Sequence, residues 1–178
     1  MRLPDDRRAY RTARLHLRPP VEGDLDAWAS WLGDVDTVRY LSGTTSTRAE
    51  SWRTLAMVIG HWQLRGYGMW SAVDVDSGAV VGRGGLWRPE GWPGLEVGWL
   101  TGPAYRRRGY AREIGAEGLR VGFEVLGAPS LISIVHVDNH ASHAVAASLG
   151  MRAEREASIC DKPCRIWQID VDSWRAAR

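Results

Sequence analysis

Several residue types and patterns are scarce in this chain of 178 residues. Two cysteines are too few for a disulfide scaffold, and without a second pair they are a poor zinc signature. No apolar run approaches the roughly 20 residues that cross a bilayer. The basic start of the chain is followed by no apolar segment, so a secretory signal is not indicated. These absences favour a cytoplasmic protein without a membrane partner.

The residues that are present are typical of one globular domain. Apolar residues make up 44% and charged residues 25% of the chain, so disorder is not the default. The length predicts a single domain over residues 1–178, with residues 1–12 as a flexible N-terminal segment. The 23 basic residues include one lysine, Lys162, and the net charge of +2 does not by itself imply a polyanionic partner.

Hydrophobic periodicity predicts an α/β domain with a mixed sheet. Alternating or continuous apolar residues predict strands at 15–19, 69–75, 79–87, 95–101, 131–135 and 165–171, with an extra strand at 152–159. Spacing of three or four predicts helices at 24–33, 47–65, 109–126 and 140–149. The third of these helices contains Gly115, Gly118 and Gly122. Since each glycine costs a helix about 1 kcal/mol relative to alanine, we expect this helix to lie very close to a sheet or a ligand.

Three consecutive arginines, Arg106–Arg108, stand directly before Gly109, where the third helix is expected to begin. The first N–H groups of a helix have no intrahelical acceptor and lie at the positive end of the helix dipole. We therefore expect these donors and the guanidinium groups to converge on a compact polyanion such as a pyrophosphate.

Other interpretations of the arginine run exist. A solvated basic face is the default for a charge run. Nucleic acid is a weaker alternative, because the basic residues are not interleaved with a stacking platform. The G-R-G-G segment from Gly82 lacks the third glycine of a dinucleotide-binding fingerprint, and no ATP-binding P-loop motif occurs.

Motifs spread over nearly the whole chain resemble the GNAT superfamily of N-acetyltransferases. R-R-R-G-Y-A at Arg106–Ala111 resembles the (Q/R)-x-x-G-x-(G/A) phosphate-binding motif of this family. It is preceded by E-V-G-W from Glu96 and followed by N-H-A-S-H-A-V-A-A-S-L-G-M from Asn139. The opening T-A-R-L-H-L-R-P, from Thr12, resembles the first strand of the RimJ/RimL-like branch of protein N-terminal acetyltransferases.

The resemblance implies a fold and a cofactor site. The fold is a mixed, mostly antiparallel sheet of six or seven strands flanked by about four helices. Two parallel strands, 96–101 and 131–135, are expected to splay apart around acetyl-CoA, with no metal. The backbone of Trp99, Leu100 and Thr101 is expected to pair with the pantetheine arm. The diphosphate is expected to bind N–H groups of Arg106, Arg107, Arg108, Gly109, Tyr110, Ala111 and Arg112.

The resemblance also implies direct transfer of an acetyl group to a primary amine. Glu96 is the candidate base, directly or through water; alternatively it is a solvated carboxylate or is paired with an arginine. Ala146 stands where many relatives have a tyrosine that protonates the departing thiolate. Ser142 is the candidate acid in its place, unless the thiolate takes its proton from water or Ser142 only bonds a preceding carbonyl. Asn139 is expected to hydrogen-bond the pantetheine, or to act only as a helix N-cap.

His136, His140 and His143 have a spacing that invites a metal site. Three ligands must converge on one ion. His136 ends a strand and Asn139 intervenes, so no metal site is expected.

The acceptor is left open by the sequence. Some of Trp31, Tyr40, Trp87 and Trp92 are expected to line the acceptor groove, an aromatic slot that fits protein N-termini, aminoglycosides, polyamines or small amino compounds. Relatives of this type are often dimers, and the chain is left open between monomer and homodimer. A non-catalytic acyl-CoA-binding or sensing domain is the alternative function, favoured by Ala146.

Overall fold

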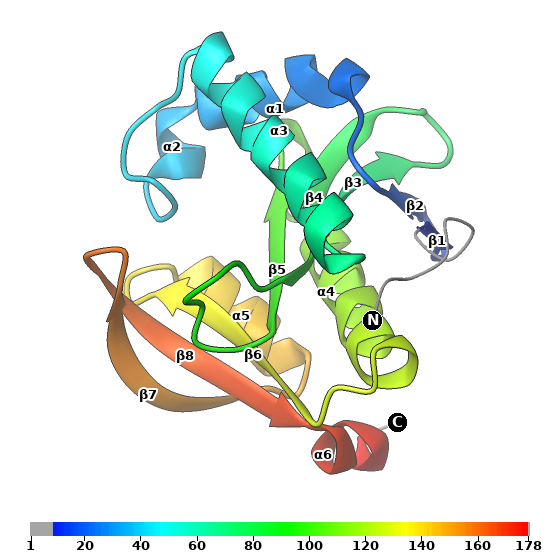
Figure 1. Cartoon of the computed structure of the whole chain (residues 1–178), viewed down its shortest axis with the longest axis vertical. Coiled ribbons are helices and arrows are strands. Elements are labelled where there is room, and N and C mark those ends of the chain that lie inside the picture. The colour runs from blue at the N-terminus through cyan, green and yellow to red at the C-terminus, as the bar shows by residue number, and fades with distance from the viewer. Residues whose placement is uncertain (1–8, 178) are drawn as a thin grey trace.

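One eight-stranded sheet organises residues 9–177, the part of the chain that the computed structural model describes (Figure 1). Its spatial order is β1-β2-β3-β4-β5-β6-β8-β7, and every neighbouring pair is antiparallel except β5 and β6. The strands are β1 Tyr10–Arg11, β2 Leu15–Arg18, β3 Met69–Asp74, β4 Val80–Trp87, β5 Glu96–Thr101, β6 Ser130–His136, β7 Arg152–Ile159 and β8 Lys162–Asp170.

The predicted mixed and mostly antiparallel sheet is therefore confirmed, with one strand more than expected. The extra strand is β1, whose two residues are too few to form an alternating pattern. Tyr10 pairs with Leu17 of β2. Of the N-terminal segment predicted to be flexible, residues 1–8 lie outside the described residues.

Six α-helices surround the sheet, where about four were expected. They are α1 Leu25–Leu32, α2 Val35–Val38, α3 Arg48–Arg65, α4 Tyr110–Arg120, α5 His140–Ser148 and α6 Val171–Ala176. The two that the sequence did not predict, α2 and α6, are four and six residues long and carry less than two turns of periodicity. Within residues 9–177, none of the helices combines the length and apolar character needed to span a bilayer.

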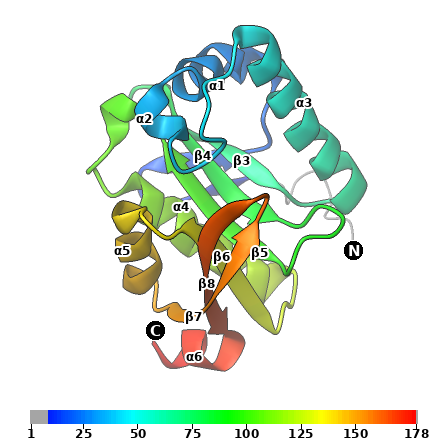
Figure 2. The ribbon, with the colours of Figure 1, turned by 90° about the vertical axis from the view of Figure 1, so that its left-hand side faces the viewer.

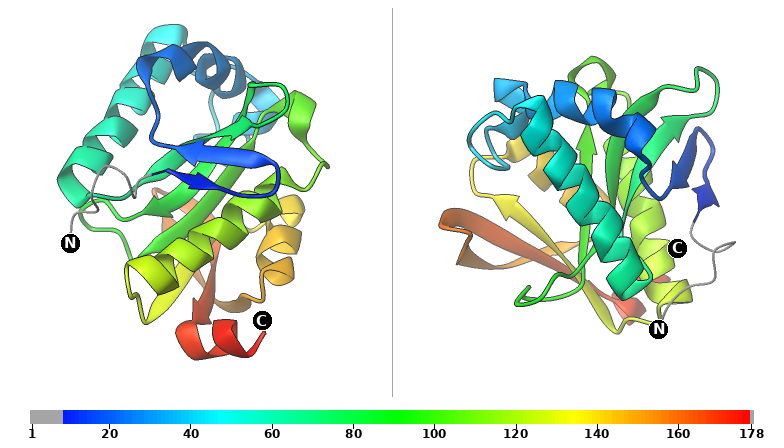
Figure 3. Two further views of the ribbon diagram at one scale, coloured as in Figure 1. Left: turned by 90° about the vertical axis from the view of Figure 1, so that its right-hand side faces the viewer. Right: turned by 45° about the horizontal axis from the view of Figure 1, so that its top comes forward.

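Alternation along the strands assigns the helices to the two faces of the sheet. Arg83 of β4 lies under Trp28 of α1, whereas a side chain at its neighbour Gly84 would meet Ile114 of α4. The helices α1 and α3 thus cover one face, and α4 covers the other (Figures 1 and 3). Glu96 lies on the α1 face, because its neighbour Val97 points toward Gly118 of α4.

The glycines of the third predicted helix have the expected purpose. A Cβ at Gly118 would lie 2.6 Å from Val97 of β5, and one at Gly122 would lie 2.5 Å from Leu131 of β6. The absence of these side chains lets the helix approach the two parallel strands closely. Its α-helical part ends earlier than predicted, and residues Val121–Val125 form a wider π-helical turn, which hydrophobic spacing does not distinguish from an α-helix.

We predict that Gly118→Ala destabilises the protein by about 1–3 kcal/mol, because the added methyl overfills a packed helix–sheet contact. The matched control is Gly60→Ala in α3, where a Cβ meets no atom within 4 Å. It is expected to stabilise by up to about 1 kcal/mol, since alanine is the better helix former. Urea unfolding measures both, and a Gly118→Ala protein as stable as the parent contradicts the close packing of α4.

Candidate functional site

The parallel strands β5 and β6 separate almost as soon as they meet. Glu96 pairs with Ile132, and Ile132 N–H donates to the Leu95 carbonyl at 3.0 Å. No further backbone pair joins the two strands in the described part of the chain. Beyond Glu96 they diverge, so the sheet has an open edge in its interior (Figures 1 and 2). The splay that the sequence predicted is thus confirmed.

Glu96 lies where the two strands part. Its side chain is 8% exposed, and Trp92 Nε1 donates to Oε2 at 2.8 Å. The Ile134 N–H, which has lost its strand partner, donates to Oε1 at 3.4 Å. The carboxylate thus occupies the first position of the gap between the strands, and the interpretation of Glu96 as a solvated carboxylate is wrong.

Burial raises the pKa of Glu96 to about 7, although the hydrogen bonds from Trp92 and Ile134 and the charge of Arg83 act in the opposite direction. Among residues 9–177 no cation lies within ion-pair distance of this carboxylate, so of the arginine-paired alternative there remains the longer-range charge of Arg83. A carboxyl group with such a pKa is close to half ionised at neutral pH. It can therefore both accept and release a proton.

A cavity of about 110 Å³ opens beside Glu96, between the diverging strands. Five residues that the sequence assigned to catalysis or cofactor binding line it: Glu96, Trp99, Leu100, Asn139 and Ser142. Thr101 continues β5 beyond the cavity. The separated motifs E-V-G-W and N-H-A-S therefore meet in space.

The start of α4 presents the backbone donors that the sequence predicted. Gly109 is the N-cap with φ +82°, in the left-handed region that favours glycine. The first helical bond is from the Glu113 N–H to the Gly109 carbonyl at 3.1 Å. The N–H groups of Tyr110, Ala111 and Arg112 have no backbone acceptor among the described residues. These three donors lie at the positive end of the helix dipole.

The side chains of the arginine run do not converge as expected. The Arg106 guanidinium turns away and donates to Thr37 and to Asp34, the latter at 3.4 Å, at the start of α2. Arg108 extends over the Tyr105 ring, with 5.7 Å between its Cζ and the ring centroid, and Arg107 is exposed. The three guanidinium groups point in different directions, which relieves the repulsion among their charges. This corrects the prediction for Arg106, whose charge is already paired.

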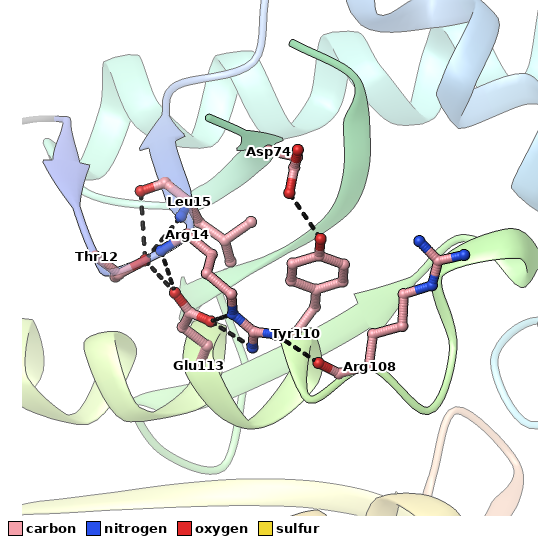
Figure 4. A network of polar contacts seen from close by, with 7 residues as sticks. All are labelled: Thr12, Arg14, Leu15, Asp74, Arg108, Tyr110 and Glu113. Atoms are coloured by element: carbon pink, nitrogen blue, oxygen red, sulfur yellow. Dashed lines mark hydrogen bonds and ion pairs between the residues drawn. The ribbon is translucent and has the colours of Figure 1, made fainter. Parts of the chain in front are cut away.

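A polar network that the sequence did not predict holds the beginning of α4 (Figure 4). Arg14, just before β2, donates from Nη1 to the Arg108 carbonyl at 2.7 Å and pairs with Glu113 at 2.6 Å. Glu113 also accepts from the Thr12 hydroxyl at 2.6 Å and from the Arg14 N–H at 2.9 Å. The orientation of the loop before α4 is thereby tied to β2. Arg14 and Glu113 are 99 residues apart, and no local pattern connects them.

A second contact fastens the same turn to β3. The Tyr110 hydroxyl donates to Asp74 Oδ2 at 2.6 Å, and this bond is the first cause of a pKa of about 2 for Asp74 (Figure 4). The carboxylate of Asp74 also accepts from the Ser77 N–H and hydroxyl in the β3–β4 turn. The first turn of α4 is thus held on both sides of its N-terminus.

The start of α5 contributes the other polar groups of the cavity. Asn139 is the N-cap, and its Oδ1 accepts from the Ser142 N–H at 3.1 Å. In the described part of the chain, the Ser142 hydroxyl has no hydrogen-bond partner, so it does not bond a preceding carbonyl. Ala146, at the tyrosine position, is fully buried.

His136 and His143 are held by separate partners, and the His140 ring lies 6.4 Å from the ring of His143, measured between centroids. His143 is fixed between Val137, whose carbonyl lies 3.1 Å from Nε2, and Trp167, which donates to Nδ1 at 2.9 Å. The His136 ring lies against Tyr40, with 5.2 Å between centroids. Among residues 9–177, no group of three His, Cys, Asp or Glu side chains is placed to hold a metal ion.

The four aromatic residues expected near the acceptor have two different environments. Trp31 and Trp87 are core residues: Trp31 packs on Gly102, and Trp87 stacks on His61 with 4.2 Å between centroids. Tyr40 lines the cavity, and Trp92 donates to Glu96. The expected aromatic slot is therefore reduced to Tyr40 and Trp92.

We predict that Glu96→Gln stabilises the protein in a pH-dependent way. An unfolded glutamate titrates near about 4.3, so between that pH and the folded pKa of about 7 the folded state binds more protons. The contribution of Glu96 to stability is therefore present at low pH and is lost as the pH rises through 7. Urea unfolding is expected to give equal stabilities near pH 4.5 and a variant more stable by roughly 2–4 kcal/mol at pH 8.5. Glu156→Gln, on an exposed carboxylate of β7, is the control without such a pH dependence, and a destabilised Glu96→Gln at pH 8.5 contradicts the assigned pKa.

Known proteins with related sequences and structures agree with this geometry. A family model described as an acetyltransferase (GNAT) domain matches residues 14–152. The uncharacterized N-acetyltransferase YnaD of Bacillus subtilis (strain 168) is 29% identical over 92 residues, which are 52% of this chain and 54% of that protein. The chain thus matches about half the length of this curated relative.

Solved structures match over nearly the full chain. An acetyltransferase from Agrobacterium tumefaciens str. C58 has a TM-score of 0.82 at 25% identity, covering 95% of each chain. A RimL ribosomal L7/L12 alpha-N-protein acetyltransferase in complex with coenzyme A has a TM-score of 0.73 at 17% identity, covering 91% of this chain and 97% of that one. At that identity the likeness concerns the fold alone. The family match over residues 14–152 shows that the chain belongs to the GNAT acetyltransferase family, with RimJ/RimL-like proteins among its structural relatives.

Proposed function

We propose that this protein is an acetyl-CoA-dependent N-acetyltransferase that moves an acetyl group directly to a primary amine. The observation that carries the proposal is the buried Glu96 carboxyl, with a pKa of about 7, at the point where β5 and β6 part. A carboxylate in the wall of a small cavity is suited to deprotonating an ammonium group. Its hydrogen bonds with Trp92 and Ile134 do not by themselves explain an acid at this position, since burial of an ionised carboxylate without an ion pair destabilises the fold.

Acetyl-CoA fits the donors that the open edge of the sheet exposes. We assign the pantetheine arm to the free edge of β5 at Trp99, Leu100 and Thr101, and the thioester to the cavity beside Glu96. The diphosphate is assigned to the beginning of α4, where N–H groups lack backbone acceptors. The residues concerned are Arg106, Arg107, Arg108, Gly109, Tyr110, Ala111 and Arg112. Of these, Arg106 is the least available, since its N–H donates to the Pro103 carbonyl at 3.4 Å and its side chain is bound to α2.

Asn139 and Ser142 complete the proposed cofactor site. Because the Asn139 side-chain oxygen caps α5, its amide NH₂ is the group available to the pantetheine. The Ser142 hydroxyl lines the cavity and is available as a donor toward the sulfur.

The proposed reaction has two steps. Glu96 takes a proton from the ammonium group, directly or through water, and the amine nitrogen attacks the thioester carbon. Backbone N–H groups at the edge of β5 stabilise the oxyanion that forms. The nitrogen of the tetrahedral intermediate loses its second proton to water, and the intermediate collapses with cleavage of the C–S bond. The thiolate leaves with a proton from water or from Ser142, which then regains a proton from water. The products are the N-acetylated amine and coenzyme A.

The buried Ala146 favours one alternative, a non-catalytic acyl-CoA-binding domain. Calorimetry with coenzyme A and thiol release from acetyl-CoA with a panel of amines separate the two functions. We predict coenzyme A binding and amine-dependent thiol release. Binding without release by any amine supports the alternative, and no binding overturns both.

We predict that Glu96→Gln lowers kcat by about 10²–10⁴-fold, the usual contribution of a general base, with an unchanged Kd for coenzyme A. In the parent protein, kcat/KM for the amine is expected to rise with pH through an apparent pKa of about 7, because the base acts in its ionised form and kcat/KM reports the pKa of the free enzyme. This rise is expected to be absent from Glu96→Gln. A variant with parental turnover removes Glu96 from the mechanism.

A further inference from the structure

Arg83 differs from the other arginines that the protein shelters from solvent. Four arginines of the described chain are not exposed. Three of them form ion pairs of 2.6 Å: Arg18 with Asp24, Arg120 with Glu117 and Arg165 with Glu156. Arg83 forms no ion pair with any carboxylate of residues 9–177. The described arginines that likewise lack an ion pair are all exposed to solvent.

The guanidinium group of Arg83 shares a cavity with Glu96. Both side chains lie on the α1 face of the sheet, from the neighbouring strands β4 and β5, and both line the cavity. The Arg83 Cζ lies 5.0 Å from the centroid of the Trp28 ring, and Nη1 donates to Met69 Sδ at 3.5 Å. Sulfur is a weak acceptor, and a guanidinium has five N–H donors. Among residues 9–177 the Arg83 side chain has no other hydrogen-bond acceptor, so most of its N–H donors are left without a protein partner.

Glu96 and Arg83 form no ion pair, although the charge of each acts on the pKa of the other. Desolvation is the larger effect on Arg83 and lowers its pKa to about 10. Desolvation likewise raises the pKa of Glu96. Whenever Glu96 is protonated, Arg83 faces no other carboxylate among the residues that line the cavity. A half-buried guanidinium group in this situation is stabilised by an anionic ligand with fork geometry.

We propose that Arg83 binds a carboxylate of the acceptor, so that the acceptor is an amine with a carboxylate group close to its amino group. This inference rests on the proposed acetyltransferase function. The amino group lies at Glu96 and the carboxylate at Arg83, on the same face and in the same cavity. Such a carboxylate is found in a free α-amino acid and in the acidic side chain of an N-terminal aspartate or glutamate. Polyamines and aminoglycosides are disfavoured, because Arg83 repels their additional ammonium groups.

The test compares acceptors that differ only in the carboxylate. Thiol release from acetyl-CoA is measured with free α-amino acids and their carboxamides, with Asp-Ala-amide and Asn-Ala-amide, and with spermidine. We expect kcat/KM to be about 10–100-fold higher for the carboxylate member of a pair, the range of a charge-assisted contact. A preference confined to amino acids or to Asp-Ala-amide identifies the source of the carboxylate. Equal rates within both pairs, or a preference for spermidine, overturn the proposal.

Variants of Arg83 separate recognition of the carboxylate from a structural role. Arg83→Met is expected to lower kcat/KM by about 10–100-fold for carboxylate acceptors and by less than about threefold for carboxamides. Arg83→Lys, which keeps the charge, is expected to recover part of the preference. Arg88→Met, at an exposed arginine just after β4, is the matched control with an unchanged preference. An equal loss for both acceptor classes in Arg83→Met assigns a structural role to Arg83 and overturns the proposal.

A binding measurement tests the carboxylate site at Arg83 independently of the proposed acetyltransferase function. N-acetyl amino acids and their carboxamides are added to the parent and to Arg83→Met, and the shift in Tm is recorded. Stabilisation of the parent by the carboxylate ligand alone, lost in Arg83→Met, supports the site even if no amine is acetylated. Equal Tm values with both ligands overturn it, whereas coenzyme A binding without turnover overturns only the catalytic proposal.

Discussion

The parting of β5 and β6 after Glu96 is the constraint on which the site depends. Backbone groups inside a sheet normally satisfy each other, and groups left unpaired away from water are costly. Here the first free N–H, of Ile134, is satisfied by the Glu96 carboxylate, and the edges beyond it face a cavity. Gly118 of α4 and Gly122 of the π-helical turn that follows it act on the same constraint, since they let the helix approach β5 and β6 closely. The gap between β5 and β6 is therefore a stable feature of the sheet.

The electrostatics of the site follow from this opening. Glu96 and Arg83 are both desolvated, they face the same cavity, and they form no ion pair, although the charge of each acts on the pKa of the other. Such an arrangement reduces stability and is typical of a functional site. At the other end of the opening, Arg14 and Glu113 hold the loop before α4 through contacts that leave its N–H groups free. The two ends thus differ: one has side chains that can titrate or bind charge, and the other has fixed backbone donors.

The sequence predicted the parts of the fold that have a strong local period. The strands from β2 to β8 and the helices α1, α3, α4 and α5 alternate or repeat over at least four residues, and their motifs brought Glu96, Asn139 and Ser142 together correctly. Very short elements, such as the four-residue α2 and the two-residue β1, carry no detectable hydrophobic period. Ion pairs between residues that lie far apart in the sequence could not be predicted from it either.

Arg83 shows most clearly why the site was only partly predictable. Its segment, G-R-G-G, was considered only as a dinucleotide-binding motif, because glycine spacing is a local signal. In the structure the glycines make room for α4 and for Trp70, and the arginine between them faces α1. Whether an arginine is paired depends on the whole fold. The same holds for Arg106, whose partner Thr37 lies in a helix that periodicity did not predict.

The most direct test of the account is a titration of the ¹⁵N-labelled protein with coenzyme A, followed by amide chemical shifts. The account predicts that the largest changes occur at Trp99–Thr101 of β5 and at residues 107–112 before and within the first turn of α4. Changes confined to Leu119, Arg120 and Trp174 of a second concave surface, or no changes at all, would contradict it.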